Sequence, residues 1–392
     1  MSAAARAAAD PNRPRAQRER NPAETRALLR WAFVLAALLA MAQVWVVPLT
    51  VAHHVLPGGR YGPDRAPPDP VYFPTSFQNP QGLWLSWAEW RPPAGTATTA
   101  VVFLLGGLGD HQHRMHRLGG LLSAAGFHVV TMDHQGQGVS EGERTYVERF
   151  EHYVTDFRLF IADRLARDGK MAGKKLFLLG RSMGGLIALH VAFGAPTNDT
   201  AAAPLSTAPM APFATEALAP RLAGVALLCP ALEVDKALDS AAARAISGFL
   251  SHRLPKLALK NFPLTPVSRF VSLVQSLEND HLRNQRGLQV RFGAELLGAM
   301  GDVFTALAPQ ATLPLLLLHG TADRVTSPGG TQRFAAAAAS ADVTLRLYDG
   351  MWHELTSDPT DGGKHSDAVL ADLFAFLNRL ATATPPKSGT TS

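Results

Sequence analysis

The sequence contains one cysteine and few charged residues. Each shortage excludes a structural feature or a class of partner. The single cysteine, Cys229, excludes a disulfide within the chain, and its place in the apolar run 224–229 predicts a buried strand residue. Charged residues make up only 18% of the chain, the net charge is +5, and no basic stripe is interleaved with aromatic residues, so nucleic acid is not an expected partner. Hydrophobic residues make up 47%, which is enough to fill the core of one large domain.

The N-terminal end has the composition of a membrane anchor. Residues 1–30 are rich in arginine without apolar periodicity, so we expect them to be disordered. Residues 31–56 are mostly apolar over a length close to the roughly 20 residues that span a bilayer, which predicts a transmembrane or signal-anchor helix. Because positive charge precedes this helix, the N-terminus of a single-pass membrane protein should stay cytoplasmic. A Pro-rich linker, residues 57–80, should follow.

Other interpretations of the apolar segment remain open. Ala40-Met-Ala42 is compatible with signal-peptide cleavage, and the arginine-rich start is compatible with an organelle transit peptide. The apolar helix could also lie within one leaflet of the membrane. The sequence does not indicate which membrane is involved.

The strongest chemical signal is a serine between two glycines. Gly180-Arg-Ser-Met-Gly184 follows a strand-like apolar run and precedes a helix-like one. A sharp turn between a strand and a helix holds the central serine in a strained conformation with its hydroxyl exposed, and only glycines leave room for the two elements there. This context predicts that Ser182 is a nucleophile.

A nucleophilic serine needs a base and an acid that orients the base, in the chain order serine, acid, histidine for this arrangement. The apolar run 313–318 leads into a loop that contains Asp323, and the shorter run 345–348 leads into a loop that contains His353. We therefore predict His353 as general base and Asp323 as its orienting acid. Asp349 is the competing acid, but it shares the turn with His353 instead of following its own strand.

Two backbone N–H groups should bind the oxyanion that forms during acyl transfer. One is that of Met183, which directly follows the nucleophile. The other is predicted at Leu108, within the glycine-rich stretch 106–109 that follows the apolar strand 100–105.

Several segments together resemble the monoacylglycerol lipase family of serine hydrolases, and the resemblance spans residues 70–380 in the correct order. The segments that carry it are 106–111, 132–144, 180–185, 278–282, 317–324 and 348–353. This family implies an α/β-hydrolase fold, with a mostly parallel central sheet flanked by helices and a helical cap. It also implies a lipid ester substrate, cleavage of monoacylglycerol to fatty acid and glycerol, and no metal or cofactor.

The resemblance further implies that Asp110 and Arg114 bind the glycerol head group. The chain departs from the family at Arg181, where histidine is usual, and at Thr356, where the family often has a second histidine. Arg181 places a permanent charge beside the site, which could favour an anionic lysophospholipid head group. The alternatives are therefore a lysophospholipase or broad carboxylesterase, an acyltransferase, or a catalytically silent binding protein.

The predicted hydrolase domain comprises residues 81–381. It contains a low-complexity insertion at 195–220 and the cap at 232–307, where an apolar helical face could serve either core packing or a lid. Residues 382–392 should form a disordered tail. The sequence does not indicate the oligomeric state or the acyl-chain preference.

Overall fold

The computed structural model describes residues 75–194, 221–233, 248–258, 266–283, 287–357 and 364–383. The predicted disordered N-terminus, the predicted transmembrane helix and the insertion at 195–220 lie outside the described residues, as do 57–74 of the linker and 384–392 of the tail. Within the described ranges, no helix is both long and apolar enough to cross a membrane.

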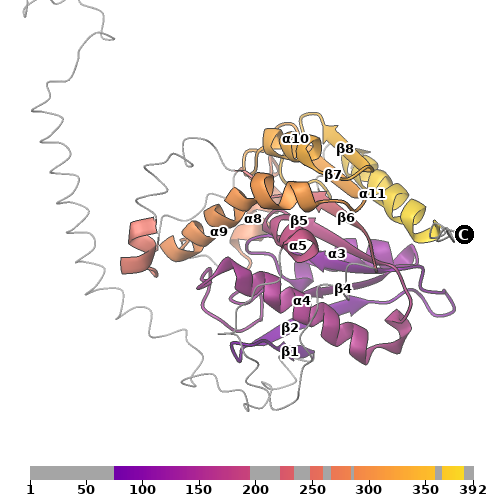
Figure 1. The fold of residues 1–392 in the computed structure, drawn as a ribbon, viewed down its shortest axis with the longest axis horizontal. Helices are drawn as coiled ribbons and strands as arrows, with labels where there is room; N and C mark the ends of the chain where they lie inside the picture. Colours follow the sequence, from indigo (N-terminus) through magenta and orange to yellow (C-terminus); the bar gives the residue numbers. More distant parts are fainter. Residues whose placement is uncertain are drawn as a thin grey trace, which may run out of the picture. The chain divides into compact units, whose positions relative to one another are not determined.

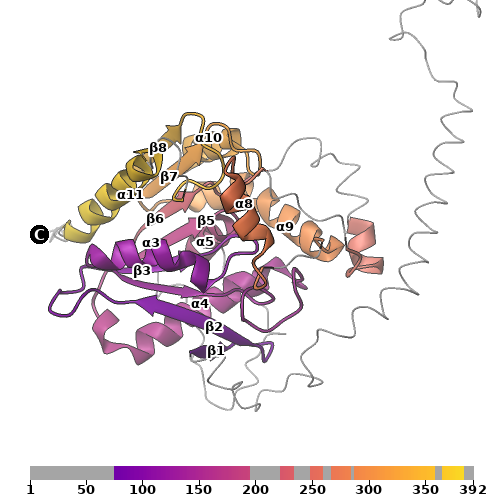
Figure 2. The same cartoon turned by 180° about the vertical axis from the view of Figure 1, so that it is seen from behind.

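One twisted sheet organises the described part of the chain, in the strand order β1-β2-β4-β3-β5-β6-β7-β8 (Figures 1 and 2). Strands β3 to β8 pair in parallel, and only β1 and β2 run antiparallel to their neighbours. This sheet confirms the predicted α/β-hydrolase fold. The strands are β1 Ser76–Gln78, β2 Trp84–Trp90, β3 Val101–Leu105, β4 His128–Met132, β5 Leu176–Arg181, β6 Leu222–Leu228, β7 Leu315–Gly320 and β8 Val343–Tyr348.

Helices cover both faces of the sheet (Figures 1 and 2). α4, α5, α9 and α10 contribute to the apolar core on one face, and α3 and α11 to the core on the other. The helices are α3 Gln112–Ala124, α4 Phe150–Arg167, α5 Met183–Phe193, α8 Val271–Glu278, α9 Val290–Asp302, α10 Pro328–Ala337 and α11 Lys364–Thr382, with short turns η3 Gly169–Met171, η5 Val303–Leu307 and η6 Ala308–Gln310.

The central strands are buried on both faces because helices lie on each side. Successive side chains of a strand point to opposite faces. On β3, Val101 and Phe103 accordingly belong to the core beneath α4 and α5, whereas Val102 and Leu104 belong to the core beneath α3 and α11. This explains why such strands read as continuous apolar runs rather than as alternating patterns.

The predicted start of the domain needs a correction. Residues 75–80 were assigned to the linker, but residues Ser76–Gln78 form β1, which pairs antiparallel with β2. Phe77 is buried and meets Phe160 of α4 edge to face, with ring centroids 5.9 Å apart. A strand of three residues is too short to produce a periodic signal, so its burial depends on contacts with distant residues.

The stretch between β6 and β7, where the cap was predicted, contains α8 and α9. α9 packs against the main core, since Phe292 and Met300 are buried and the Phe292 ring lies 6.4 Å from that of Tyr153. Core packing therefore accounts for the apolar face of this helix. Residues 234–247 of the predicted cap lie outside the described residues.

Candidate active site

Ser182 occupies the strained turn that the sequence predicted. It lies between β5 and α5 with φ 54° and ψ −121°, a backbone conformation that non-glycine residues rarely adopt. The turn is held because the Ser182 N–H donates to the Leu228 carbonyl over 2.9 Å and the Ser182 carbonyl accepts from Ala231. A Cβ on Gly184 would collide with the Leu105 carbonyl, which explains the glycine after the serine.

Asp323 and His353 are brought together as predicted. Asp323 lies in the loop after β7, and its Oδ2 is 2.7 Å from His353 Nδ1. This contact favours the tautomer with a proton on Nδ1, which leaves Nε2 as the basic atom. Asp349, the competing acid, instead accepts a hydrogen bond from the Thr321 hydroxyl over 3.1 Å. Asp323 is therefore the acid that contacts His353.

The carboxylate of Asp323 is held by more donors than the sequence indicated. Oδ1 accepts the backbone N–H groups of Val325 and Thr326, at 2.7 and 3.1 Å. Oδ2 accepts the Thr326 hydroxyl at 2.9 Å and lies 3.1 Å from Nε2 of the fully buried His319. Burial alone would raise the pKa of Asp323, but the hydrogen bonds from His319 and His353 outweigh it and hold that pKa well below its usual range.

Sequence reasoning missed His319 and Thr326 as partners of Asp323. His319 is the fifth residue of β7, and its Nδ1 lies 2.7 Å from the Thr331 hydroxyl of α10. A polar residue inside an otherwise apolar strand is the one signal that could have indicated it.

In residues 106–110, here called the oxyanion loop, the N–H group of Leu108 has no acceptor among the described residues. The Gly107 N–H donates to Asp110 Oδ2 and the Gly109 N–H to Gln137 Oε1, both over 2.7 Å. Among the described residues, the N–H groups of Leu108 and Met183 find no acceptor. A Cβ on Gly107 would lie 2.9 Å from that of Ser182, so the loop directly faces Ser182. Both predicted donors are thus available.

Among the described residues, no hydrogen bond joins Ser182 Oγ to His353 Nε2. The strands that precede these two residues, β5 and β8, are separated in the sheet by β6 and β7. The sulfur of Cys229, directly after β6, lies close to Asp323 and His353. Catalytic hydrogen bonds are often long in unliganded enzymes and tighten in the substrate complex. Ser182, Asp323 and His353 all lie at the carboxyl edge of the sheet, where parallel sheets place their chemistry.

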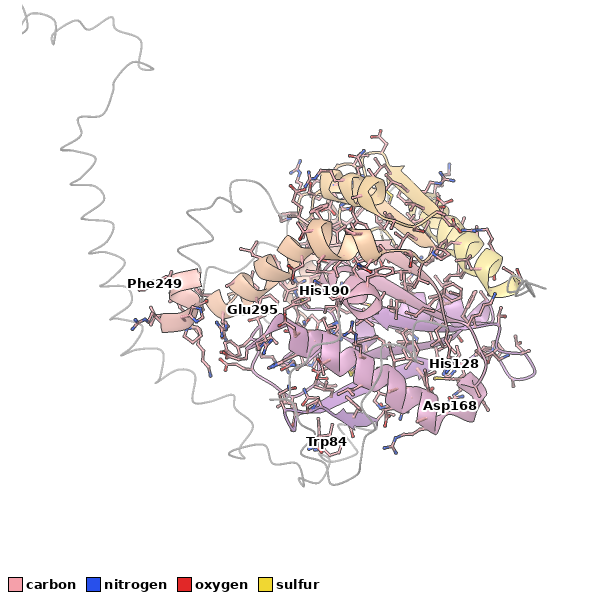
Figure 3. The ribbon with its side chains drawn as sticks, in the orientation of Figure 1. Trp84, His128, Asp168, His190, Phe249 and Glu295 are labelled. Atoms are coloured by element: carbon pink, nitrogen blue, oxygen red, sulfur yellow. The ribbon has the colours of Figure 1, made fainter. Side chains whose placement is uncertain are left out.

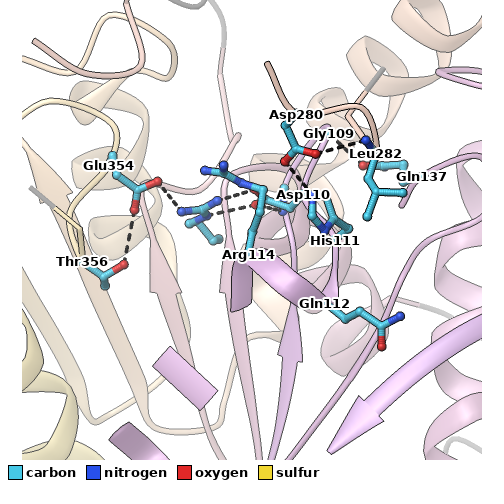
Figure 4. A network of polar contacts seen from close by, with 12 residues as sticks. Gly109, Asp110, His111, Gln112, Arg114, Gln137, Asp280, Leu282, Glu354 and Thr356 are labelled. Atoms are coloured by element: carbon cyan, nitrogen blue, oxygen red, sulfur yellow. Dashed lines mark hydrogen bonds and ion pairs between the residues drawn. The ribbon is translucent and has the colours of Figure 1, made fainter. Parts of the chain in front are cut away.

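The three predicted head-group residues form a charge cluster (Figure 4). Arg181 contacts both oxygens of Asp110 and also Glu354, while Arg114 Nε lies 3.3 Å from Asp110 Oδ1. Burial alone would raise the pKa of Asp110, but the charges of Arg181 and Arg114 hold that pKa far below its usual value. Thr356 is buried and donates to Glu354 over 3.3 Å.

This cluster corrects the expectation for Arg181. The sequence suggested a free positive charge beside the nucleophile, but two carboxylates neutralise Arg181. The reason for expecting it to attract an anionic head group is therefore removed. Glu354 was missed because nothing in a lone glutamate after His353 indicates its partner, which is distant in the sequence.

Two groups of side chains each bring three potential metal ligands together. They are Cys229, Asp323 and His353 in the first, and Glu89, His128 and Asp168 in the second, where Figure 3 shows His128 and Asp168 near each other. In the first group both Asp323 oxygens already accept hydrogen bonds, and burial raises the pKa of the Cys229 thiol, which disfavours the thiolate that metals require. In the second group the guanidinium of Arg91 already binds both carboxylates. The absence of a metal or cofactor stays a prediction.

Cys229 is buried as predicted, although it follows β6 instead of lying within it. Its φ of 42° marks the bend by which the chain leaves the strand.

A serine in a strained turn, an aspartate–histidine pair and two free N–H groups at one edge of a parallel sheet define a serine hydrolase of the α/β-hydrolase class. Such a site can transfer an acyl group through the serine oxygen without a metal.

Comparison with known proteins gives the family. Residues 96–218 and 210–360 match the family described as "Serine aminopeptidase, S33". The chain is 32% identical over 306 residues to Monoglyceride lipase of Mus musculus, which covers 78% of this chain and 90% of that protein. It is 31% identical over 314 residues to Monoglyceride lipase of Homo sapiens, and the match covers 80% of this chain and 92% of that protein. The crystal structure of Paleococcus ferrophilus monoacylglycerol lipase aligns with a TM-score of 0.59 at 27% identity, covering 74% of this chain and 99% of that one.

The chain therefore belongs to the monoacylglycerol lipase family of serine hydrolases, as its motifs predicted, and it is a serine ester hydrolase.

Proposed function

We propose that this protein hydrolyses monoacylglycerols to fatty acid and glycerol through an acyl-enzyme on Ser182. The observation that carries the proposal is the hydrogen-bonded Asp323–His353 pair at the same sheet edge as the strained Ser182. The names of the relatives, which are monoglyceride lipases, support the same substrate.

In the proposed mechanism, His353 Nε2 takes the Ser182 proton as the serine oxygen attacks the ester carbonyl. The N–H groups of Leu108 and Met183 bind the oxyanion, each contributing about 3 kcal/mol to stabilisation of the transition state. Protonated His353 then gives its proton to the leaving glycerol oxygen. Finally His353 activates a water molecule that hydrolyses the acyl-enzyme. Asp323 orients the imidazole and stabilises its charged form throughout.

The charge balance around the nucleophile supports a neutral head group. The positive charges of Arg181 and Arg114 are matched by the negative charges of Asp110 and Glu354, so these two arginines are not free to recruit a phosphate. We propose that Arg114, held beside Asp110, reaches the glycerol hydroxyls and that Asp110 orients it. Asp110 itself is already engaged by Gly107, Arg114 and Arg181.

The test is to assay full-length protein in detergent micelles on 1- and 2-monoacylglycerol and on lysophosphatidylcholine with the same acyl chain. We expect faster release of fatty acid from monoacylglycerol, abolished in Ser182→Ala because the attacking oxygen is gone. A variant with a tenth of wild-type activity would contradict the assignment of the nucleophile. Ser182→Ala should unfold at the wild-type temperature, which serves as the control for folding.

Other outcomes would move the function to one of the alternatives. Faster cleavage of lysophosphatidylcholine would indicate a lysophospholipase with the same catalytic residues. Transfer of the acyl group to an added alcohol in preference to water would indicate an acyltransferase. Absence of turnover on every ester would indicate a silent binding protein.

We also propose that residues 31–56 anchor the enzyme in a membrane with the N-terminus cytoplasmic, because its proposed substrate resides in the bilayer. With a C-terminal tag on the full chain, alkaline carbonate should leave the protein in the membrane fraction. In sealed vesicles, the tag and the N-terminus should differ in access to protease. Release of a shortened chain into the soluble fraction would indicate signal-peptide cleavage instead.

A further inference from the structure

Arg181 joins three of the four segments that carry the proposed catalytic groups. It immediately precedes Ser182, and its guanidinium binds Asp110 in the oxyanion loop and Glu354, which immediately follows His353. Nε donates to Asp110 Oδ2 over 3.0 Å, Nη2 donates to Asp110 Oδ1, and Nη1 donates to Glu354 Oε2 over 2.5 Å. One side chain thus connects the loops that follow β3, β5 and β8.

The contact with Asp110 reaches the oxyanion loop itself. Asp110 Oδ2, which accepts from Arg181, also accepts the Gly107 N–H over 2.7 Å. The peptide fixed in this way directly precedes Leu108, whose N–H is a proposed oxyanion donor. The orientation of that donor therefore depends on a carboxylate that Arg181 holds by both oxygens.

Burial makes this cluster sensitive to the loss of one member. The side chains of Arg181, Asp110 and Glu354 are only 14%, 8% and 4% exposed. Charges at such depth are stable only when paired, and removal of the cation would leave two carboxylates without it. Arginine suits the position because its planar fork binds a carboxylate through two N–H groups and is weakly hydrated.

We propose that Arg181 and Glu354 are positioning residues, whose ion pair sets the separation of Ser182 and His353 while Arg181 orients the oxyanion loop through Asp110. Neither residue touches the substrate in this role. The role rests on the proposed functions of Ser182 and His353, but it does not require the substrate to be a monoacylglycerol.

The test uses two substrates that differ in the head group. Full-length wild type and Arg181→Met are assayed in detergent on monoacylglycerol and on p-nitrophenyl butyrate, which has no glycerol. Because misplacement of catalytic groups by about 1 Å can cost roughly 100-fold, we expect kcat to fall about 10- to 100-fold by the same factor on both substrates. KM for p-nitrophenyl butyrate should stay within about twofold, because this ester has no glycerol for Arg114 to bind. Arg181→Lys should recover part of the loss, since a point charge replaces only part of the fork.

Glu354→Gln keeps the test decisive if Arg181→Met fails to fold. Arg181 retains Asp110 in this isosteric variant, so we expect a smaller fall in kcat, about 3- to 10-fold on both substrates. The double variant should be no less active than Arg181→Met alone, because Glu354 acts only through Arg181. Thermal unfolding of every variant separates loss of positioning from loss of the fold.

Arg91→Met is the matched control, because Arg91 also binds two carboxylates but far from the catalytic loops. Wild-type kcat in Glu354→Gln, or a loss in Arg181→Met confined to KM for monoacylglycerol, would overturn the proposal. A wild type that cleaves only the nitrophenyl ester, with that activity lost in Ser182→Ala, would contradict the proposed substrate and leave the test of Arg181 valid.

Discussion

Two arginines of this molecule each bind two carboxylates. They lie at opposite ends of the strands of the same sheet. Arg181 binds Asp110 and Glu354 at the edge where the parallel strands end. Arg91 binds Glu89 at 2.9 Å and Asp168 at 2.8 Å, near the edge where those strands begin. The two groups are chemically alike, and each has a histidine nearby: His353 in the first and His128 in the second.

Burial distinguishes them. The Arg91 side chain is 40% exposed and that of Arg181 is 14% exposed. Water screens the Arg91 group, so its ion pairs contribute little to stability. The Arg181 group is desolvated and connects three loops, so the loss of one member leaves uncompensated charge in the interior. An arginine with two carboxylates is thus a surface ion-pair group at Arg91, whereas at Arg181 the same combination connects the loops of the candidate site.

The largest effect on kcat should come from replacing Asp323, the carboxylate that contacts His353. Asp323→Asn should lower kcat about 10⁴-fold, because the imidazole of His353 loses the acceptor that fixes its tautomer. Asp349→Asn is the matched control and should retain activity within about twofold, since Asp349 contacts Thr321 and not His353. Steady-state kinetics on a nitrophenyl ester measures both. Equal losses in the two variants would make Asp349 a second acid of the site.

The free energy of unfolding should fall much more when Arg181 is replaced than when Arg91 is replaced. We expect Arg181→Met to lower the free energy of unfolding by about 3–5 kcal/mol, the usual result of leaving a buried charge unpaired. Urea unfolding followed by tryptophan fluorescence measures the change. A loss below about 1 kcal/mol would mean that the buried cluster behaves like a surface ion pair.

Asp156 of α4 extends the comparison to a buried carboxyl without a cation. Its Oδ2 accepts from Asn79 and Gln135, at 3.1 and 2.9 Å, but burial outweighs these bonds and raises its pKa to about 7. Because the folded-state pKa exceeds the ordinary value of 3.8, its contribution to stability is complete below about pH 4 and is lost as pH rises to about 7.

Asp156→Asn should remove this dependence while keeping the acceptor. Relative to the variant, the wild type should lose on the order of 4 kcal/mol between pH 4 and pH 7. The difference between the two stability curves is the relevant quantity, because burial also raises the pKa of Asp133 to about 7. Parallel curves would show that Asp156 is ionised in the folded protein.

The smallest effect on stability is expected from replacing Arg91. Arg91→Met should change the free energy of unfolding by less than about 1 kcal/mol and leave kcat unchanged, because solvent replaces its contacts. The same urea titration in low and high salt should show a small salt-dependent difference. A loss as large as that of Arg181→Met would mean that exposure does not explain the difference between the two clusters.

Local patterns were enough to predict much of the site. The glycines around Ser182 indicate a strained turn because only that residue type fits beside Leu105 and the start of α5. Apolar runs before Asp323 and His353 place both residues after strands, and the structure brings them to 2.7 Å. The glycine-rich loop indicates close approach of the backbone to Ser182, which the geometry of Gly107 matches.

Contacts between distant segments were not predictable in the same way. Arg181 is 71 residues from Asp110 and 173 from Glu354, and no periodicity relates them. β1 was assigned to a linker because three residues carry no pattern, although Phe77 is buried. His319 reads as one polar residue in an apolar strand, and only the fold shows that it serves Asp323.

The sequence by itself determined the strand and helix periods, the strained turn at Ser182, and the places of Asp323 and His353 after strands, because these depend on backbone conformation and on neighbouring residues. Only the tertiary structure decided that the charge of Arg181 is paired, that Asp323 has five donors, and that the Arg181 side chain is largely buried while that of Arg91 is exposed. The physical reason is that charge and hydrogen bonding depend on what surrounds a group. In this protein the order of strands in the sheet sets those surroundings.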